Sequence, residues 1–142
     1  MPLVIVGGSS AVYRQADLEP VEGVVLAGYV DDDTLSSLYS RARGVVFPSF
    51  AEGFGLPLVE AALAGARLAV SDIPVFRWIA GDHPIYFDPH DQDSVVHALR
   101  VLLEDAPLAG TGFADAVTRR FSWESSAAVV GDACRAVSGT HG

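Results

Sequence analysis

The chain has 142 residues, half of them hydrophobic, and is therefore long and apolar enough to bury a substantial core in one domain. Nine basic residues against eighteen acidic ones give a net charge of −9, which argues against nucleic-acid binding because that function needs basic patches to neutralise phosphates. Cys134, the single cysteine, cannot form an internal disulfide, which favours a reducing compartment. The sequence shows no leader peptide and no run of roughly 18 apolar residues that would span a membrane, so we expect a cytoplasmic protein.

Two short apolar runs near the N-terminus predict buried strands. They cover residues 3–7 and 23–28, and each ends on a glycine. Asp31 to Asp33 follow, and we interpret them mainly as the cap and first turn of a helix. The apolar positions after Asp33 have the spacing i, i+3, i+4 and i+7, which predicts a helix with one buried face. These positions are Leu35, Leu38, Tyr39 and Ala42.

The rest of the chain continues the alternation of strands and helices. Strands are predicted at 45–47, 67–71 and 85–87, and helices at 57–64, 75–80, 93–104, 106–120 (with glycine breaks) and from Ser122 to about 137. The inner face of the helix at 93–104 is predicted to carry Val95, Val96, Leu99, Leu102 and Leu103. Continuous apolar strands separated by helices predict an α/β, Rossmann-like parallel sheet covered on both faces. We expect one domain over residues 1–138 and a disordered tail at 139–142.

The segment from Ser49 to Gly65 is the most informative stretch of the sequence. Two glutamates, Glu52 and Glu60, flank a glycine-rich turn that follows a predicted strand and leads into a predicted helix. Such a turn brings backbone N–H groups and a helix N-terminus toward an anion, and in a parallel sheet it lies at the carboxyl ends of the strands, where ligands bind. Carboxylates at both ends of the turn suit hydroxyl groups. The segment therefore predicts a site for a phosphorylated sugar.

An ordered series of motifs runs through residues 3–105. It comprises Gly-Tyr-Val at 28–30, Leu-x-x-Leu-Tyr at 35–39, Pro-Ser at 48–49, Glu-Gly-Phe-Gly-Leu-Pro-x-x-Glu at 52–60, Ala-Gly at 64–65, Ser-Asp-Ile-Pro at 71–74 and Tyr-Phe-Asp-Pro at 86–89. In this order the series resembles the C-terminal, donor-binding domain of retaining GT-B glycosyltransferases (family 4-like, group 1). The resemblance implies half of a GT-B fold and transfer of a hexose from a nucleoside diphosphate to an acceptor, in polysaccharide biosynthesis.

The resemblance also implies roles for individual residues. Glu52 is the expected catalytic residue, which holds donor-sugar hydroxyls and orients the sugar for transfer, and Glu60 is expected to hold the ribose hydroxyls. Backbone amides around Gly55 would meet the sugar and the diphosphate, and the turn at 28–30 would lie against the nucleobase. The implied donor-binding residues are Gly28, Tyr29, Val30, Ser49, Gly53, Phe54, Gly55, Leu56 and Glu60. No cofactor and no metal are expected, because amides and basic side chains take the role of a cation.

Taken singly, several of these residues have simpler interpretations. Glu60 in a first helical turn would complement the helix dipole, and Glu52 would be a solvated loop acid. Phe54 is as well explained by packing against the turn as by a ligand contact. Asp72 is better explained as a turn residue than as a general base. The four histidines have no metal-ligand spacing with Cys134, and we expect them to be exposed.

The sequence departs from the resembled family in two places. The resemblance implies that the first strand and helix of the donor domain, with the Arg and Lys that neutralise the diphosphate, are absent from these residues, and we expect the same of the acceptor-binding domain. We therefore expect an inactive fragment, whose full-length parent would bind a sugar or lipid-linked acceptor and could associate with the inner face of the membrane.

The second departure is Trp78, which stands where relatives often carry a glutamate. The motifs around Phe76 and Tyr86 favour mannosyltransferase-like relatives and hence GDP-mannose.

Two other functional classes remain as alternatives. A non-catalytic nucleotide-binding or assembly module would have the same fold and the same truncation. A flavodoxin-like or response-regulator domain has little support, since the chain contains no lysine at all. A missing edge strand would expose apolar sheet, from which we expect homodimers.

Overall fold

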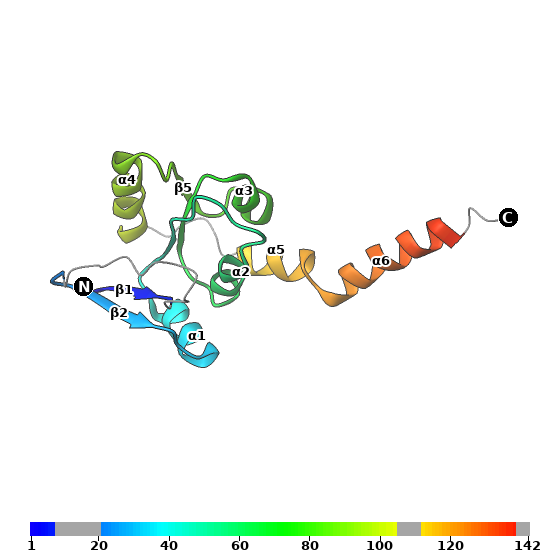
Figure 1. The fold of residues 1–142 in the computed structure, drawn as a ribbon, viewed down its shortest axis with the longest axis horizontal. Helices are drawn as coiled ribbons and strands as arrows, with labels where there is room; N and C mark the ends of the chain where they lie inside the picture. Colours follow the sequence, from blue (N-terminus) through cyan, green and yellow to red (C-terminus); the bar gives the residue numbers. More distant parts are fainter. Residues whose placement is uncertain (8–20, 105–111, 139–142) are drawn as a thin grey trace. The chain divides into compact units, whose positions relative to one another are not determined.

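The computed structural model describes residues 1–7, 21–104 and 112–138. The predicted tail at 139–142 and the start of the helix predicted at 106–120 lie outside these residues. The chain divides into two compact units, Met1–Leu38 and Tyr39–Gly142. Figure 1 gives their elements in chain order, coloured from blue to red.

The first unit contains two parallel strands and most of one helix. β1 (Leu3–Val6) pairs with β2 (Val24–Gly28), and α1 (Asp32–Arg41) follows. The Thr34 amide donates to Asp31 Oδ1 at 2.7 Å, and this hydrogen bond lowers the pKa of Asp31, which confirms the predicted cap.

The predicted burial in this unit is wrong in two respects. No residue of α1 is buried, and Ala42 lies beyond the end of the helix and is exposed. The two strands predicted to be buried are not: every residue of β1 is exposed and no residue of β2 is buried, because among the described strands each pairs with the other alone and a two-stranded sheet has little interior.

The second unit is built on three parallel strands in the order β3–β4–β5, each followed by a helix. The strands are β3 (Val45–Phe47), β4 (Leu68–Ser71) and β5 (Ile85–Phe87). The helices are α2 (Leu56–Leu63), α3 (Pro74–Ala80), α4 (Gln92–Leu103), α5 (Phe113–Arg120) and α6 (Trp123–Ser138). The predicted α/β class with parallel strands is confirmed, and all predicted elements in the described residues form, within a few residues of their expected ends.

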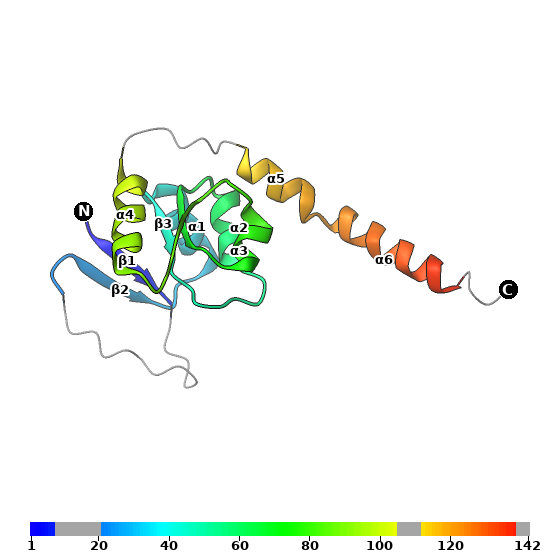
Figure 2. The same cartoon turned by 90° about the horizontal axis from the view of Figure 1, so that it is seen from above.

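Helices cover both faces of this sheet, as the sequence predicted. Figure 2 shows α4 on one side of β3, and α2 and α3 on the other. The central strand alternates accordingly, since Leu68 and Val70 pack into the larger core with Leu58 and Phe76, whereas Ala69 packs under α4. All four residues of β4 are buried.

Helix α4 contacts the sheet along a narrower stripe than predicted. Ala98 and Leu102 are its buried residues, with Val95 packed beside them. Val96 and Leu103, predicted to face inward, are 36% and 37% exposed. Each follows a residue of the row that packs on the sheet (Val95, Ala98 and Leu102) and therefore points about 100° away from it around the helix axis. The small side chain of Ala98 lets the helix approach the sheet closely at the centre of this row.

Candidate functional site

The turn between β3 and α2 has the geometry of a ligand-binding loop. Gly55 is the N-cap of α2 and has φ +79°, the left-handed region that favours glycine. A Cβ placed there would lie 3.1 Å from Phe76 Cε1 and 3.3 Å from Ile79 Cδ1, so the turn also rests tightly on the core. Within the described residues, the amides of Phe54, Gly55 and Leu56 donate no hydrogen bond. These three amides are the predicted contacts to sugar and diphosphate, and the conformation leaves them available.

Glu52 stands exposed in this turn and is held by a neighbour. Ser49 Oγ donates a hydrogen bond to Glu52 Oε1 at 2.7 Å. The bond restricts the carboxylate without neutralising it, and each carboxylate oxygen keeps a lone pair for a hydroxyl group. Ser49 and Glu52, both among the residues that the resemblance implies for the donor site, are therefore joined by a direct hydrogen bond.

Glu60 lies in the second turn of α2. The helix begins at Leu56, and its first turn contains no acidic residue. The interpretation of Glu60 as a first-turn partner of the helix dipole is therefore wrong, because that effect is confined to the first turn. Burial raises the pKa of Tyr39, and the charge of Glu60 adds to this increase, so the carboxylate lies within electrostatic reach of the Tyr39 phenol.

Phe54 packs within the protein. Its ring makes edge contacts with Trp78 at 6.0 Å and with Phe121 at 5.5 Å between centroids, and 39% of it is exposed. Arg120 completes the cluster, since its guanidinium lies 4.4 Å from the Trp78 ring centre and donates to the Trp78 carbonyl. Trp78, at a position where the resembled family often carries a glutamate, thus supports residues 49–56, called the donor loop after their predicted role, through Phe54. The packing interpretation of Phe54 is supported.

The other predicted contacts lie in the first unit. Gly28 ends β2 with φ +65°, and Tyr29, the residue after it, is exposed. Gly28, Tyr29 and Val30 belong to the unit Met1–Leu38, whereas Ser49 to Glu60 belong to Tyr39–Gly142. Each group has the local geometry of a strand end followed by a turn, and their roles remain predictions.

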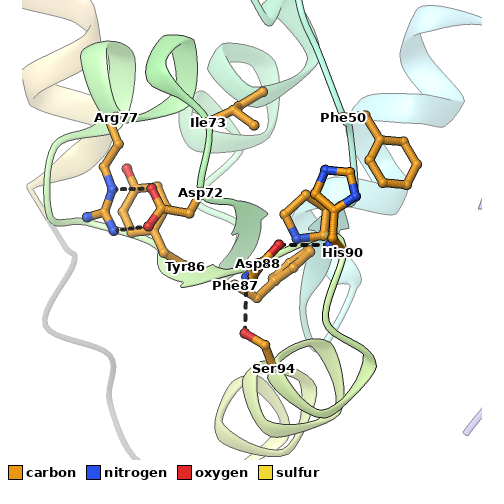
Figure 3. Close-up of a pocket in the computed structure, with 10 residues that line it drawn as sticks. Phe50, Asp72, Ile73, Arg77, Tyr86, Phe87, Asp88, His90 and Ser94 are labelled. Carbon is orange, nitrogen blue, oxygen red and sulfur yellow. Dashed lines mark hydrogen bonds and ion pairs between the residues drawn. The ribbon is translucent and has the colours of Figure 1, made fainter.

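A cavity lies beside the donor loop, and the turns that follow β3 and β4 both contribute to its lining. This cavity, of about 450 Å³, lies at the carboxyl ends of β4 and β5 (Figure 3). Its lining residues are Phe50, Asp72, Ile73, Arg77, Tyr86, Phe87, Asp88, Pro89, His90 and Ser94. The sequence places the turns at 49–57 and 71–74 after strands, where the carboxyl ends of parallel strands meet at one edge and can line one crevice, whereas the contribution of Asp88 to this lining was not predicted.

On one side of the cavity, a charged pair lies over an aromatic ring. Arg77 donates two hydrogen bonds to Asp72, each 2.7 Å long, and its guanidinium lies 3.5 Å from the centre of the Tyr86 ring (Figure 3). The bonds from Arg77 lower the pKa of Asp72. A carboxylate with a lowered pKa is a poor proton acceptor, which supports the interpretation of Asp72 as a structural residue.

On the other side, a short loop places a second carboxylate beside an aromatic ring. The His90 amide donates to Asp88 Oδ1 at 2.8 Å, and the Asp88 amide donates to Ser94 Oγ at 3.0 Å (Figure 3). The His90 imidazole lies 5.0 Å from the ring of Phe50, which belongs to the donor loop and is 66% exposed. The cavity and the donor loop are therefore contiguous.

Tyr86 gives a testable pH dependence. Burial raises its pKa from 10.0 to about 12, and its hydroxyl donates to the Gly81 carbonyl at 2.6 Å. The folded state favours the neutral phenol, so its stabilising contribution is complete below pH 10 and is lost as the pH rises toward about 12. We expect an ultraviolet titration of tyrosinate to show a late step that Tyr86→Phe removes and that Tyr29→Phe, a change at an exposed tyrosine, retains. Because the pKa of Tyr39 is raised as well, the amplitude of the late step decides the outcome, and an unchanged amplitude in Tyr86→Phe would contradict the assignment.

The part of the chain that the structure describes contains no group of three His, Cys, Asp or Glu side chains suited to a metal ion, and none of its helices is long and apolar enough to cross a membrane. His90 and His97 are exposed as expected, His83 is half-buried against Phe113, and His141 lies outside the described residues.

Comparison with known proteins gives consistent matches. The family described as "Glycosyl transferases group 1" matches residues 1–105. O-antigen chain mannosyltransferase B of Escherichia coli is 39% identical over 102 residues, which are 69% of this chain and 26% of the relative. O-antigen chain mannosyltransferase RfbU of Salmonella typhimurium is 34% identical over 116 residues, 82% of this chain and 32% of the relative. The chain thus spans about a quarter to a third of these two relatives.

A solved structure supports the fold. Sucrose-phosphate synthase from Thermosynechococcus elongatus superposes with a TM-score of 0.71 at 26% identity, over 84% of this chain and 31% of that one. Parallel strands flanked by helices, the loop between Glu52 and Glu60, and the family match over residues 1–105 agree with one another. The chain belongs to the group 1 glycosyltransferases.

Proposed function

We propose that these residues form the donor-binding half of a retaining glycosyltransferase that transfers a hexose from a nucleoside diphosphate to an acceptor. The observation that carries the proposal is the turn at 49–56. It combines a restrained carboxylate, Glu52, with three available amides around the left-handed Gly55. Carboxylate oxygens accept hydrogen bonds from sugar hydroxyls, and amides at a helix N-terminus donate to phosphate or sugar oxygens.

In the proposed reaction the bond between the anomeric carbon and the diphosphate breaks, and a bond from that carbon to an acceptor hydroxyl forms on the same face. The hydroxyl proton passes to the leaving phosphate oxygen. Glu52 orients the donor sugar, while the amides of the turn stabilise charge that develops in the transition state. This role for the amides requires no metal ion. The names of the mannosyltransferase relatives favour mannose as the transferred sugar, and we propose GDP-mannose as the donor.

Glu60 provides the most direct test of donor binding. A charge-assisted hydrogen bond contributes about 1.5–3 kcal/mol, so Glu60→Ala should weaken binding of GDP-mannose on the order of 10- to 100-fold. Amide NMR titrations with UDP-, GDP- and ADP-sugars measure this effect and identify the base. We expect shifts at residues 28–30 and 52–60. Glu124→Ala, which removes another exposed glutamate, is the matched control and should bind as the unmodified chain does.

The same titration tests the alternative of a non-catalytic assembly module. The absence of amide shifts with all three nucleotide sugars would contradict donor binding by this chain.

We further propose that the isolated chain binds the donor without turning it over and that its acceptor is a sugar or a lipid-linked sugar. Release of mannose or its transfer by the isolated chain would refute the first of these statements.

We also propose that the chain forms dimers through β1, whose side chains are exposed. Sedimentation that shows a monomer at all protein concentrations would exclude such dimers.

A further inference from the structure

The cavity beside the donor loop has properties of a ligand site that the donor does not explain. Its volume of about 450 Å³ falls in the range of small-molecule sites, which is roughly 300–1,000 Å³. Its walls combine an exposed aromatic ring, Phe50, with the carboxylates Asp72 and Asp88 and the hydroxyl of Ser94. Aromatic faces with a few convergent polar groups are the usual lining of sites for small organic ligands.

The charges of the cavity select the chemical class of the ligand. Two carboxylates against one guanidinium leave a net negative charge on the lining. The guanidinium is partly neutralised, since Arg77 donates two hydrogen bonds to Asp72 and covers the Tyr86 ring. A phosphate that approached its remaining N–H donors would meet the negative charges of Asp72 and Asp88. A neutral, hydroxyl-rich ligand meets no such obstacle, because its hydroxyls donate to carboxylates and its C–H face packs on an aromatic ring.

The position of the cavity suggests which saccharide it holds. The donor loop follows β3, and the cavity lies at the ends of β4 and β5, the next strands in the sheet. Phe50 belongs to both, two residues before Glu52, so the backbone positions of the two residues lie at most about 7 Å apart. A sugar ring in the cavity would therefore lie beside a donor sugar held by Glu52.

We propose that this cavity binds a neutral sugar ring of the saccharide acceptor, on the proposed donor-binding half itself. The inference rests on the proposed function. Phe50 provides the stacking face, and Asp88 accepts hydrogen bonds from the sugar hydroxyls. The Arg77–Asp72 pair forms the opposite wall and keeps anions out. Figure 3 shows this arrangement, with the pair and the Phe50–His90 contact on opposite sides.

The test uses the labelled 142-residue chain and three probes, the methyl α-glycosides of mannose, glucose and galactose. A ligand of this size is expected to bind with a Kd of about 1 mM or weaker, so titration should reach about 50 mM. At least one glycoside should shift the amides of Phe50, Asp72, Asp88 and His90 in a saturable way. Phe50→Ala and Asp88→Asn should each weaken this binding about fivefold or more.

Two design features make the result decisive. The side-chain amide introduced by Asp88→Asn keeps an oxygen acceptor for the His90 amide, so this change preserves the loop while removing the charge. Asp132→Asn removes an exposed carboxylate that does not line the cavity and should leave binding unchanged. No saturable shifts with any of the three glycosides would overturn the inference, and so would shifts caused by inorganic phosphate alone.

GDP-mannose, added separately, distinguishes this inference from the proposed function. Shifts at residues 52–60 with the nucleotide sugar, but none in the cavity with glycosides, would refute the acceptor site alone. Glycoside shifts without nucleotide shifts would retain the saccharide site and refute donor binding. Competition between GDP-mannose and a glycoside for the cavity would assign the cavity to the donor sugar and overturn the acceptor assignment.

Discussion

Phe76→Ala is expected to lower the free energy of unfolding by about 3–5 kcal/mol, the upper end of the range for a single truncation in a buried core. The Phe76 side chain is 1% exposed, packs against Phe47 with ring centroids 6.4 Å apart, and lies directly beneath the donor loop at Gly55. Its truncation removes a large buried apolar surface and leaves a cavity. Denaturant unfolding, followed by circular dichroism, measures the loss.

Trp123→Ala is the matched control for this prediction. It also removes a large aromatic side chain, but Trp123 is among the most exposed residues of the described chain, and its loss should change stability by no more than about 0.5 kcal/mol. Equal losses for the two variants would show that Phe76 is not part of the folded core in solution.

Gly55→Ala is expected to cost about 2–5 kcal/mol. The left-handed backbone at φ +79° costs an L-residue roughly 1–2 kcal/mol, and overpacking against Phe76 and Ile79 adds about 1–3 kcal/mol. Gly53→Ala, in the same loop, is the control, since a Cβ there meets nothing within 4 Å. It should leave stability almost unchanged. Thermal or denaturant unfolding of both variants makes the comparison.

A double-mutant cycle separates the two costs at Gly55. In the Phe76→Ala background the nearest obstacle is gone and Ile79 Cδ1 at 3.3 Å remains, so Gly55→Ala should cost its backbone strain and only part of the overpacking. We therefore expect a coupling free energy between the two sites of about 0.5–3 kcal/mol. Strict additivity would mean that the loop does not rest on Phe76 as the structure shows.

Local patterns in the sequence were sufficient for most secondary structure. The cap by Ser122, whose Oγ accepts from the Ser125 amide at 3.0 Å, involves residues three apart and is visible in the sequence. The strands of the second unit were predicted nearly residue by residue because each is a short apolar run between turn residues. The glycine turn between Glu52 and Glu60 was recognisable for the same reason.

Burial was predicted less well than the elements themselves. The apolar stripe of α4 named Val96 and Leu103, although the contact line runs through Val95, Ala98 and Leu102. Hydrophobic periodicity predicts the buried face of a helix to within about one residue, which corresponds to about 100° around the helix axis. Which side of that face meets the sheet depends on the approach of the whole helix.

The class of fold, the order of strands and helices along the chain, and the glycine turn flanked by Glu52 and Glu60 all follow from the amino-acid sequence. The packing of Phe54 on Trp78 and Phe121, and the Arg77–Asp72 pair over Tyr86 beside a cavity, emerge only from the folded arrangement. Separation along the chain accounts for this difference. Caps, turns and periodic faces arise from hydrogen bonds and sterics within a few residues, whereas the cavity exists only where helices have packed on the sheet and brought separate strand ends together.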